Sequence, residues 1–250
     1  SVYSWGGDLH GLLGRGANTG AVDCTDLNRY PANPTPQRIP TLTRVRDVTA
    51  GQLNAYATTV DGRVYVWGTS TTAAGVYDPI NVPREVPGLS NVVQLAANGT
   101  DVIAVLSDGR VFGWGFFGAV PALLGLGNNG SVPTPALLPG LAGDRVVQVA
   151  GDSSQMFAVL LATGEIRFWT YNTGTVPVRP KPGETSLVTM ARNAFGTLET
   201  KRTLGTLPAI RQIAGSKFGI IAYGVNGEVY EMLIRFTCSG CKDEIDFVRI

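Results

Sequence analysis

Two stretches of the chain decide its fold: Thr58–Gly68 (TTVDGRVYVWG) and Val105–Gly115 (VLSDGRVFGWG). Each consists of an apolar segment, an Asp-Gly dipeptide and a second β-rich segment that ends in Trp-Gly. Asp-Gly accepts positive φ at both centres of a two-residue hairpin turn, so each stretch predicts a β-hairpin. Weaker copies occur at Leu161–Thr170 (LATGEIRFWT) and Gly224–Leu233 (GVNGEVYEML), and the chain opens on VYSWGG at Val2–Gly7. The chain is therefore built from a repeated β-hairpin unit.

The other parts of the unit recur in a constant order. After the Trp-bearing segment come a variable loop, a Pro-marked segment such as NVPREVPGL (Asn81–Leu89), and a strand such as VVQVAG (Val146–Gly151). These segments are short, rich in β-branched and aromatic residues, and spaced by turn residues, as strands are. No helical stripe of apolar residues is longer than two turns. We therefore expect an all-β chain whose four-stranded antiparallel sheets pack face to face around an axis, which is a β-propeller.

Composition favours one folded, turn-rich region. Of the 250 residues, 44% are hydrophobic and 16% are charged, against about 25% charged in an average soluble domain. The net charge is +1 with no basic stripe, so we expect no nucleic-acid binding, and no run of 18 apolar residues predicts a membrane span. We expect a single propeller region over residues 1–250, with repeats at 1–63, 64–110, 111–165 and 166–228 and a partial repeat at 229–250.

Two glycine-rich loops carry a family resemblance. GLLGRG (Gly11–Gly16) and ALLGLG (Ala122–Gly127) each follow a Trp-Gly, and a P-x-x-(V/I/L)-P stretch and V-x-x-V-A-x-G come after them. In this order the elements resemble the regulator of chromosome condensation repeat, which implies a propeller, typically of seven blades. The chain departs from that pattern because it lacks the usual His after the Ala-Gly element. The second unit keeps only AAGVY (Ala73–Tyr77) of the glycine-rich loop, and the fourth carries a long insert at Tyr171–Thr197.

Four full units and a remnant are too few for seven blades. Further sequence completes the ring, another chain covers the open end, or the ring closes with about five blades; the start in mid-pattern at Ser1 favours the first. In an open array the faces of Val2, Tyr3 and Trp5 must meet another polypeptide. The expected partner is thus a protein, a further segment of the same chain, or a second copy.

Tryptophan recurs at one position of the repeat, as Trp5, Trp67, Trp114 and Trp169. A large apolar residue repeated in this way is expected to fill the space between neighbouring sheets. Function is expected in the loops that differ between repeats, because binding residues gather on loops held by a rigid scaffold. The candidate binding residues are the aromatic and Arg side chains of those loops: Arg29, Tyr30, Tyr77, Phe116, Phe117, Tyr171 and Arg179.

These features favour a non-catalytic protein-binding or assembly module that presents variable loops on a propeller scaffold. His10 is the only histidine, and no Ser-His-Asp set or paired carboxylates can be placed, so we expect no catalytic residue and no cofactor. The resemblance leaves open a regulatory role such as guanine-nucleotide exchange, known for the family's namesake, although its acidic and histidine positions cannot be mapped here. An enzyme with its site in the propeller mouth is the other alternative.

The cysteines and sequons bear on location. Cys238 and Cys241 form a C-x-x-C pair that we interpret as a disulfide; free thiols, or a Cys3His zinc set with Cys24 and His10, are the alternatives. We expect no metal. N-glycosylation triplets begin at Asn98 and Asn129. Together with the low charge, these features favour an extracellular or luminal location over a cytoplasmic or nuclear one.

Overall fold

The described part of the chain is built of strands. The computed structural model describes residues 1–8, 11–16, 32–51, 53–71, 77–98, 101–115, 132–138, 141, 143–151, 157–169, 184–192, 198–215, 219–235 and 244–249. Its regular elements over these ranges are β1 to β19, so the all-β prediction is confirmed. Among these residues no helix has the length and apolar character needed to cross a membrane.

The strands form five sheets that follow one another along the chain. The first has two strands, β1 (Tyr3–Gly7) and β2 (Ala32–Arg38). The second contains β3 (Val45–Ala50), β4 (Asn54–Thr59), β5 (Val64–Thr71) and β6 (Tyr77–Glu85), and the third contains β7 (Val92–Asn98), β8 (Asp101–Leu106), β9 (Val111–Gly115) and β10 (Val132–Leu137). The fourth contains β11 (Val146–Gly151), β12 (Phe157–Leu161), β13 (Ile166–Trp169), β14 (Glu184–Arg192) and β15 (Leu198–Pro208), and the fifth contains β16 (Ile210–Gly215), β17 (Gly219–Gly224), β18 (Val229–Arg235) and β19 (Glu244–Arg249).

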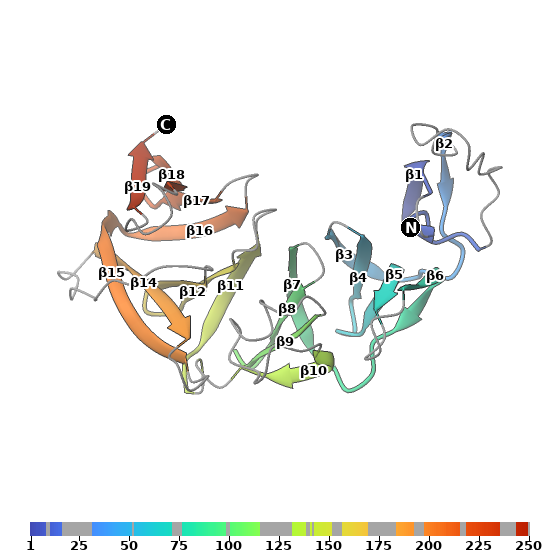
Figure 1. The fold of residues 1–250 in the computed structure, drawn as a ribbon, viewed down its shortest axis with the longest axis horizontal. Helices are drawn as coiled ribbons and strands as arrows, with labels where there is room; N and C mark the ends of the chain where they lie inside the picture. The colour runs from blue at the N-terminus through green and yellow to red at the C-terminus, as the bar shows by residue number, and fades with distance from the viewer. Residues whose placement is uncertain are drawn as a thin grey trace.

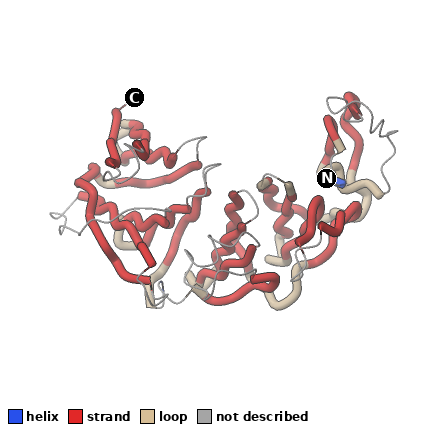
Figure 2. The backbone as a smooth tube through the Cα atoms, viewed as in Figure 1, coloured by secondary structure: helices blue, strands red, loops and turns tan. Residues whose placement is uncertain are grey.

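The sheets stand side by side along an open arc, with β1–β2 at one end and β16–β19 at the other (Figure 1). The first strands of successive sheets lie next to one another, since β7 contacts β3 and β11, and β11 contacts β16. Apolar clusters fill the spaces between neighbouring sheets, and one of them joins Ile103 and Val105 of β8 to Val149 and Phe157 of the next sheet. The tube in Figure 2 shows the same succession of strand groups, with a short helical turn near the N-terminus. The predicted propeller architecture, in the form of an incomplete ring, is confirmed.

The Asp-Gly turns form as the sequence predicts. Thr58 pairs with Val64 across the Asp61-Gly62 turn, and Gly62 has φ +77, in the region that glycine adopts without strain. Val105 pairs with Val111 across the equivalent Asp108-Gly109 turn. The hairpin register therefore follows from the local turn chemistry.

The repeat bounds expected from the sequence are out of phase with the sheets. The repeat 64–110 contains the last two strands of the second sheet, β5 and β6, and the first two strands of the third, β7 and β8. The next repeats divide in the same way, so that each repeat links two neighbouring sheets covalently. The first repeat, 1–63, provides β1 and β2 and then β3 and β4. The first sheet therefore contains only β1 and β2, which correspond to β5 and β6 of the second sheet. Among the described residues it has no strands that correspond to β3 and β4.

Two expected variable segments are partly strand. In the insert expected at Tyr171–Thr197, residues Glu184–Arg192 form β14, which pairs in parallel with β13 and makes the fourth sheet five-stranded. In the segment 68–81, the β5–β6 ladder continues to the pair Thr71–Tyr77. Both segments contain β-branched residues, which favour extended backbone, and the edge of the neighbouring strand supplies their hydrogen-bond partners.

Candidate functional site

A broad cleft runs along the first strands of four sheets. It encloses about 650 Å³ and is lined by residues of β3, β7, β11 and β16, among them Asp47, Gln94, Gln148 and Gln212 at equivalent positions. These first strands face the inside of the arc in Figure 1. The first strands that line this cleft therefore form the wall that would surround the central channel of a complete ring. We call them the inner wall.

Glutamines of this wall hold neighbouring sheets together. The Gln94 amide bonds the backbone of Val149 twice: Oε1 accepts from the Val149 N–H at 2.9 Å, and Nε2 donates to the Val149 carbonyl at 3.1 Å. One sheet further, Gln148 Oε1 accepts from the Ile213 N–H at 2.7 Å. A side-chain amide has one donor and one acceptor side, as a strand backbone does, so it substitutes for a ladder between sheets that do not pair. The polar Gln between apolar neighbours in VVQLAA and VVQVAG is thus an intersheet contact.

The two ends of the wall differ from its middle. Asp47 occupies the glutamine position of β3, and the link to β7 comes from Arg46 instead, whose Nη2 donates to the Val92 carbonyl at 2.6 Å. Gln212 occupies that position in β16, the first strand of the last sheet, and its side chain is exposed. No sheet follows it among the described residues. Gln212 therefore presents to solvent the same amide that binds a neighbouring backbone elsewhere.

Gln94→Ala is expected to lower the free energy of unfolding by about 1–2 kcal/mol, because it leaves the Val149 N–H and carbonyl without their partners. Gln212→Ala is the matched control, and as a surface change it is expected to stay within about 0.5 kcal/mol of the parent. Urea unfolding of the three proteins measures both effects. Equal destabilisation by the two substitutions would contradict the intersheet role.

The aromatic residues at the Trp position also differ along the arc. Trp67 and Trp114 are 4% and 6% exposed and belong to the apolar clusters between the first three sheets, as predicted. Trp5 is 61% exposed and Tyr3 is 55% exposed. The prediction that every Trp of the repeat fills an intersheet space is therefore wrong for Trp5. The physical reason is that no described sheet precedes β1–β2. The side chain of Trp169 lies outside the described residues.

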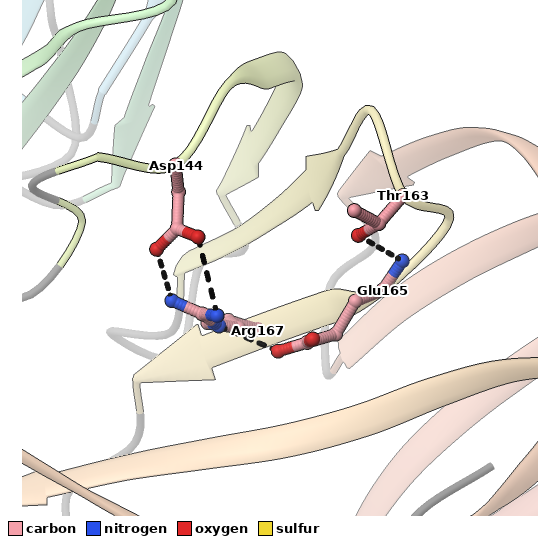
Figure 3. A network of polar contacts seen from close by, with 4 residues as sticks. All are labelled: Asp144, Thr163, Glu165 and Arg167. Atoms are coloured by element: carbon pink, nitrogen blue, oxygen red, sulfur yellow. Dashed lines mark hydrogen bonds and ion pairs between the residues drawn. The ribbon is translucent and has the colours of Figure 1, made fainter.

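A charged network ties the fourth sheet together (Figure 3). The Arg167 guanidinium, 17% exposed, binds both carboxylate oxygens of Asp144, and its Nε donates to Glu165 Oε1 at 2.6 Å. Burial lowers the pKa of Arg167, but the hydrogen bond and charge of Glu165, together with those of Asp144, outweigh that effect and raise it. The guanidinium thus stays charged and joins the turn before β11 to β13, which is a structural contact.

A second polar group is buried between the second and third sheets. The Tyr56 side chain is 2% exposed, and its ring lies edge-on to Trp114 with centroids 6.2 Å apart. Burial, with a further contribution from the charge of Asp101, raises the pKa of Tyr56, so the hydroxyl stays protonated. This group borders a cavity of about 210 Å³. It was missed in the sequence because Asn54 and Tyr56 belong to a strand that contacts Trp114 only through intersheet packing.

The structure does not bring the predicted binding residues together. Of the seven, only the backbone of Tyr77 is described, at the start of β6. The others lie outside the described residues: Arg29, Tyr30, Phe116, Phe117, Tyr171 and Arg179. They stay predictions.

The cysteine and glycosylation predictions have a similar outcome. Cys24, Cys238, Cys241, His10 and Asn129 lie outside the described residues. Within the described ranges, no three His, Cys, Asp or Glu side chains are close enough to hold a metal ion. Asn98, at the end of β7, is 2% exposed. Its burial weighs against a glycan on this side chain.

Comparisons with known proteins agree with the architecture. Residues 1–57 match the family model of the regulator of chromosome condensation (RCC1) repeat, which confirms the resemblance found in the sequence. The structure is similar to that of human WBSCR16, with a TM-score of 0.70 and 22% identity, over 100% of this chain and 62% of that one. It is also similar to Prp20p of Saccharomyces cerevisiae, solved in a study of its binding to Gsp1p and histones, with a TM-score of 0.61 and 17% identity, over 92% of this chain and 53% of that one. No curated protein sequence matches the chain.

A further neighbour is yeast RCC1 (Prp20) bound to Kap60, with a TM-score of 0.58 and 18% identity, over 82% of this chain and 47% of that one. The chain thus spans about half to three fifths of the length of these neighbours. At these identities the likeness shows the fold alone.

The expected extracellular or luminal location is contradicted by the same matches. The matching repeat is named for chromosome condensation, and the yeast neighbour binds histones, which are proteins of the cell interior. The expectation rested on short signals, since a sequon occurs often by chance. The burial of Asn98 removes part of its support.

Proposed function

Because the chain joins a regulator of chromosome condensation repeat at residues 1–57 to an open arc of propeller sheets, we propose that it is a non-catalytic protein-binding and assembly module. The observation that supports this proposal is the exposed aromatic face of the first sheet. Tyr3 and Trp5 are 55% and 61% exposed, whereas Trp67 and Trp114, at the same position of the repeat as Trp5, are almost fully buried. Exposed Trp and Tyr side chains are typical of the centres of protein interfaces.

The open edge of β1 indicates that the partner binds by adding β-strands to the first sheet. In the other sheets the strand equivalent to β1 has a neighbour on both sides; β5, for example, lies between β4 and β6. Among the described strands β1 pairs with β2 alone, which leaves its other edge with unpaired backbone groups. A partner that adds two strands, equivalent to β3 and β4, would pair with this edge. A further sheet of the same partner, placed before β1–β2 in the arc, would cover Tyr3 and Trp5.

The opposite end of the arc offers the complementary surface. Gln212 presents an exposed amide there, and the inner glutamines show that such an amide binds the backbone of the next first strand. We therefore propose that the module joins another polypeptide of the same repeat chemistry, either in a second chain or in a further segment. Nucleotide exchange and a catalytic site in the propeller mouth stay hypotheses that no described residue favours.

The chain expressed alone is expected to self-associate, because its first sheet carries an open strand edge and exposed aromatic side chains, and its last sheet exposes the Gln212 amide. The double substitution Tyr3→Lys with Trp5→Lys is expected to reduce association strongly, since it places two charges on the open face. Leu137→Lys is the matched control: Leu137 is 46% exposed but lies on β10 of the third sheet, away from both ends of the arc, and its replacement is expected to leave association unchanged.

Light scattering over a concentration series measures the mass of each protein. A wild-type chain that stays monomeric, unfolds cooperatively and binds no dye for exposed apolar surface would overturn the proposed role of these ends. Such a result would point to a self-closed ring instead.

A further inference from the structure

The cavity between the second and third sheets corresponds to a space between the first and second sheets. In that earlier space a loop of the chain is present. Between the first and second sheets the loop Gly11–Gly16 lies against Trp67. The carbonyl of Leu12 accepts from the Trp67 indole N–H at 2.8 Å, and Leu13 is 3% exposed. The N–H of Gly16 donates to the Asn81 carbonyl of β6 at 2.8 Å. A short Leu-Leu-Gly turn thus fills the space between the first and second sheets.

The second sheet has no such turn among its described residues. Its β5–β6 ladder continues to the pair Thr71–Tyr77, whereas β1 ends at Gly7 and leaves a long connection before β2. The sequence agrees, because this unit keeps only AAGVY of the glycine-rich loop. Among the described residues, a cavity lies beside Trp114 at this place.

The open space is a cavity of about 210 Å³. Its walls include Tyr56, Ile80, Trp114 and Val132, and Arg84 and Glu85 also border it. Its lining is about half apolar and half polar, so an occupant is expected to combine apolar surface with hydrogen-bonding groups. The volume equals that of about seven waters at ~30 Å³ each, which matches one apolar side chain and its backbone better than a large cofactor.

Two buried oxygen atoms of the cavity residues lack a partner among the described residues. Asn54 and Thr69 are 6% and 3% exposed, and neither Asn54 Oδ1 nor Thr69 Oγ1 makes a hydrogen bond. Asn54 Oδ1 can accept a hydrogen bond, and Thr69 Oγ1 can accept one as well as donate one. A buried polar atom without a hydrogen bond is costly, so both atoms select an occupant that brings N–H or O–H donors.

We propose that this cavity binds a peptide turn of the Gly-Leu-Leu-Gly type from a partner protein. One leucine side chain fills the space beside Tyr56 and Trp114, and backbone N–H groups of the turn donate to Asn54 Oδ1 and Thr69 Oγ1. The chain itself shows that such a turn fits between two of its sheets, at the position one repeat earlier. The inference rests on the proposed protein-binding role and adds the chemistry of a second partner site, distant from Tyr3 and Trp5.

The probe is the peptide acetyl-GLLGRG-amide, which has the sequence of residues 11–16. Isothermal titration of the full chain is expected to show binding with a dissociation constant on the order of 10⁻⁴ M, and acetyl-GAAGRG-amide is expected not to bind measurably. Thr69→Val keeps the shape of the side chain and removes the hydroxyl, so it is expected to weaken binding about tenfold. Val132→Trp, which fills the cavity from its wall, is expected to abolish binding.

Trp5→Lys is the control variant, because it disrupts the proposed assembly face and leaves the cavity intact. Peptide binding that survives Trp5→Lys and weakens in Thr69→Val supports the site whatever the association state of the chain. Melting temperatures near that of the parent show that the variants are folded. Undetectable binding of GLLGRG at millimolar concentration, or equal binding by the parent and Thr69→Val, would overturn the proposal. Tighter binding of a small polyol than of the peptide at this cavity would overturn the assignment of a peptide ligand.

Discussion

Replacing Trp67 with alanine is expected to lower the free energy of unfolding by about 3–5 kcal/mol. The indole is 4% exposed and packs with Ile39, Leu42 and Ile80 between the first two sheets. Its removal leaves a cavity in that cluster and leaves the Leu12 carbonyl without the 2.8 Å hydrogen bond it accepts. Both losses act on the same intersheet space, so the first sheet is expected to detach from the second before the rest of the arc unfolds.

Trp5→Ala provides a control at the same position of the repeat. Since Trp5 is 61% exposed, its replacement is expected to change the free energy of unfolding by less than about 1 kcal/mol. Both variants are measured by chemical denaturation, at concentrations where light scattering shows a monomer. A Trp67→Ala protein whose stability lies within 1 kcal/mol of that of Trp5→Ala would contradict the assignment of Trp67 to the core.

Gly62→Ala is expected to destabilise the chain by about 2–5 kcal/mol. Gly62 has φ +77, which costs an L-residue about 1–2 kcal/mol. An added Cβ would also lie 2.6 Å from Asn91 Cα and 2.7 Å from its nitrogen, so the turn would have to move away from the next sheet. Overpacking of this kind costs about 1–3 kcal/mol more. The hydrogen bond from the Val92 N–H to the Gly62 carbonyl, 3.1 Å long, would be lost with that movement.

Gly227→Ala separates the two effects. Gly227 occupies the same turn position in the last sheet with φ +86, and no described atom lies within 4 Å of an added Cβ. Only the conformational cost of about 1–2 kcal/mol is expected there. Thermal unfolding of the two variants compares the costs directly. If they were equal, the packing of each Asp-Gly turn against the following sheet would contribute nothing to stability.

The local parts of the fold could be read from the residues. The Asp-Gly turns, the strands beside them and the all-β class depend on φ preferences and on the alternation of side chains, which act over a few residues. The position of Trp67 and Trp114 between sheets also followed from their recurrence at one place in the repeat. The resemblance to the regulator of chromosome condensation repeat rested on the same order of elements.

The candidate sites were less accessible to sequence reasoning. The predicted loop residues lie outside the described part, while the residues that form the intersheet cavity, Asn54, Thr69 and Trp114, are separated by up to 60 residues. Neither Asn54 nor Thr69 carries a local pattern that marks it as buried beside Trp114. Gln94 and Gln148 were visible as polar residues in apolar strands, but their partners, Val149 and Ile213, lie in other sheets.

The sequence by itself thus determined the hairpins, the repeat and the class of architecture, because these depend on short-range backbone preferences. Tertiary structure alone decided that each repeat spans two sheets, that Glu184–Arg192 pairs in parallel with β13, and that Trp5 is exposed while Trp67 is buried. Whether a side chain is buried depends on the sheet that stands against it. For Trp5 there is no such sheet among the described residues, and no property of the residues beside Trp5 in the sequence reveals that difference.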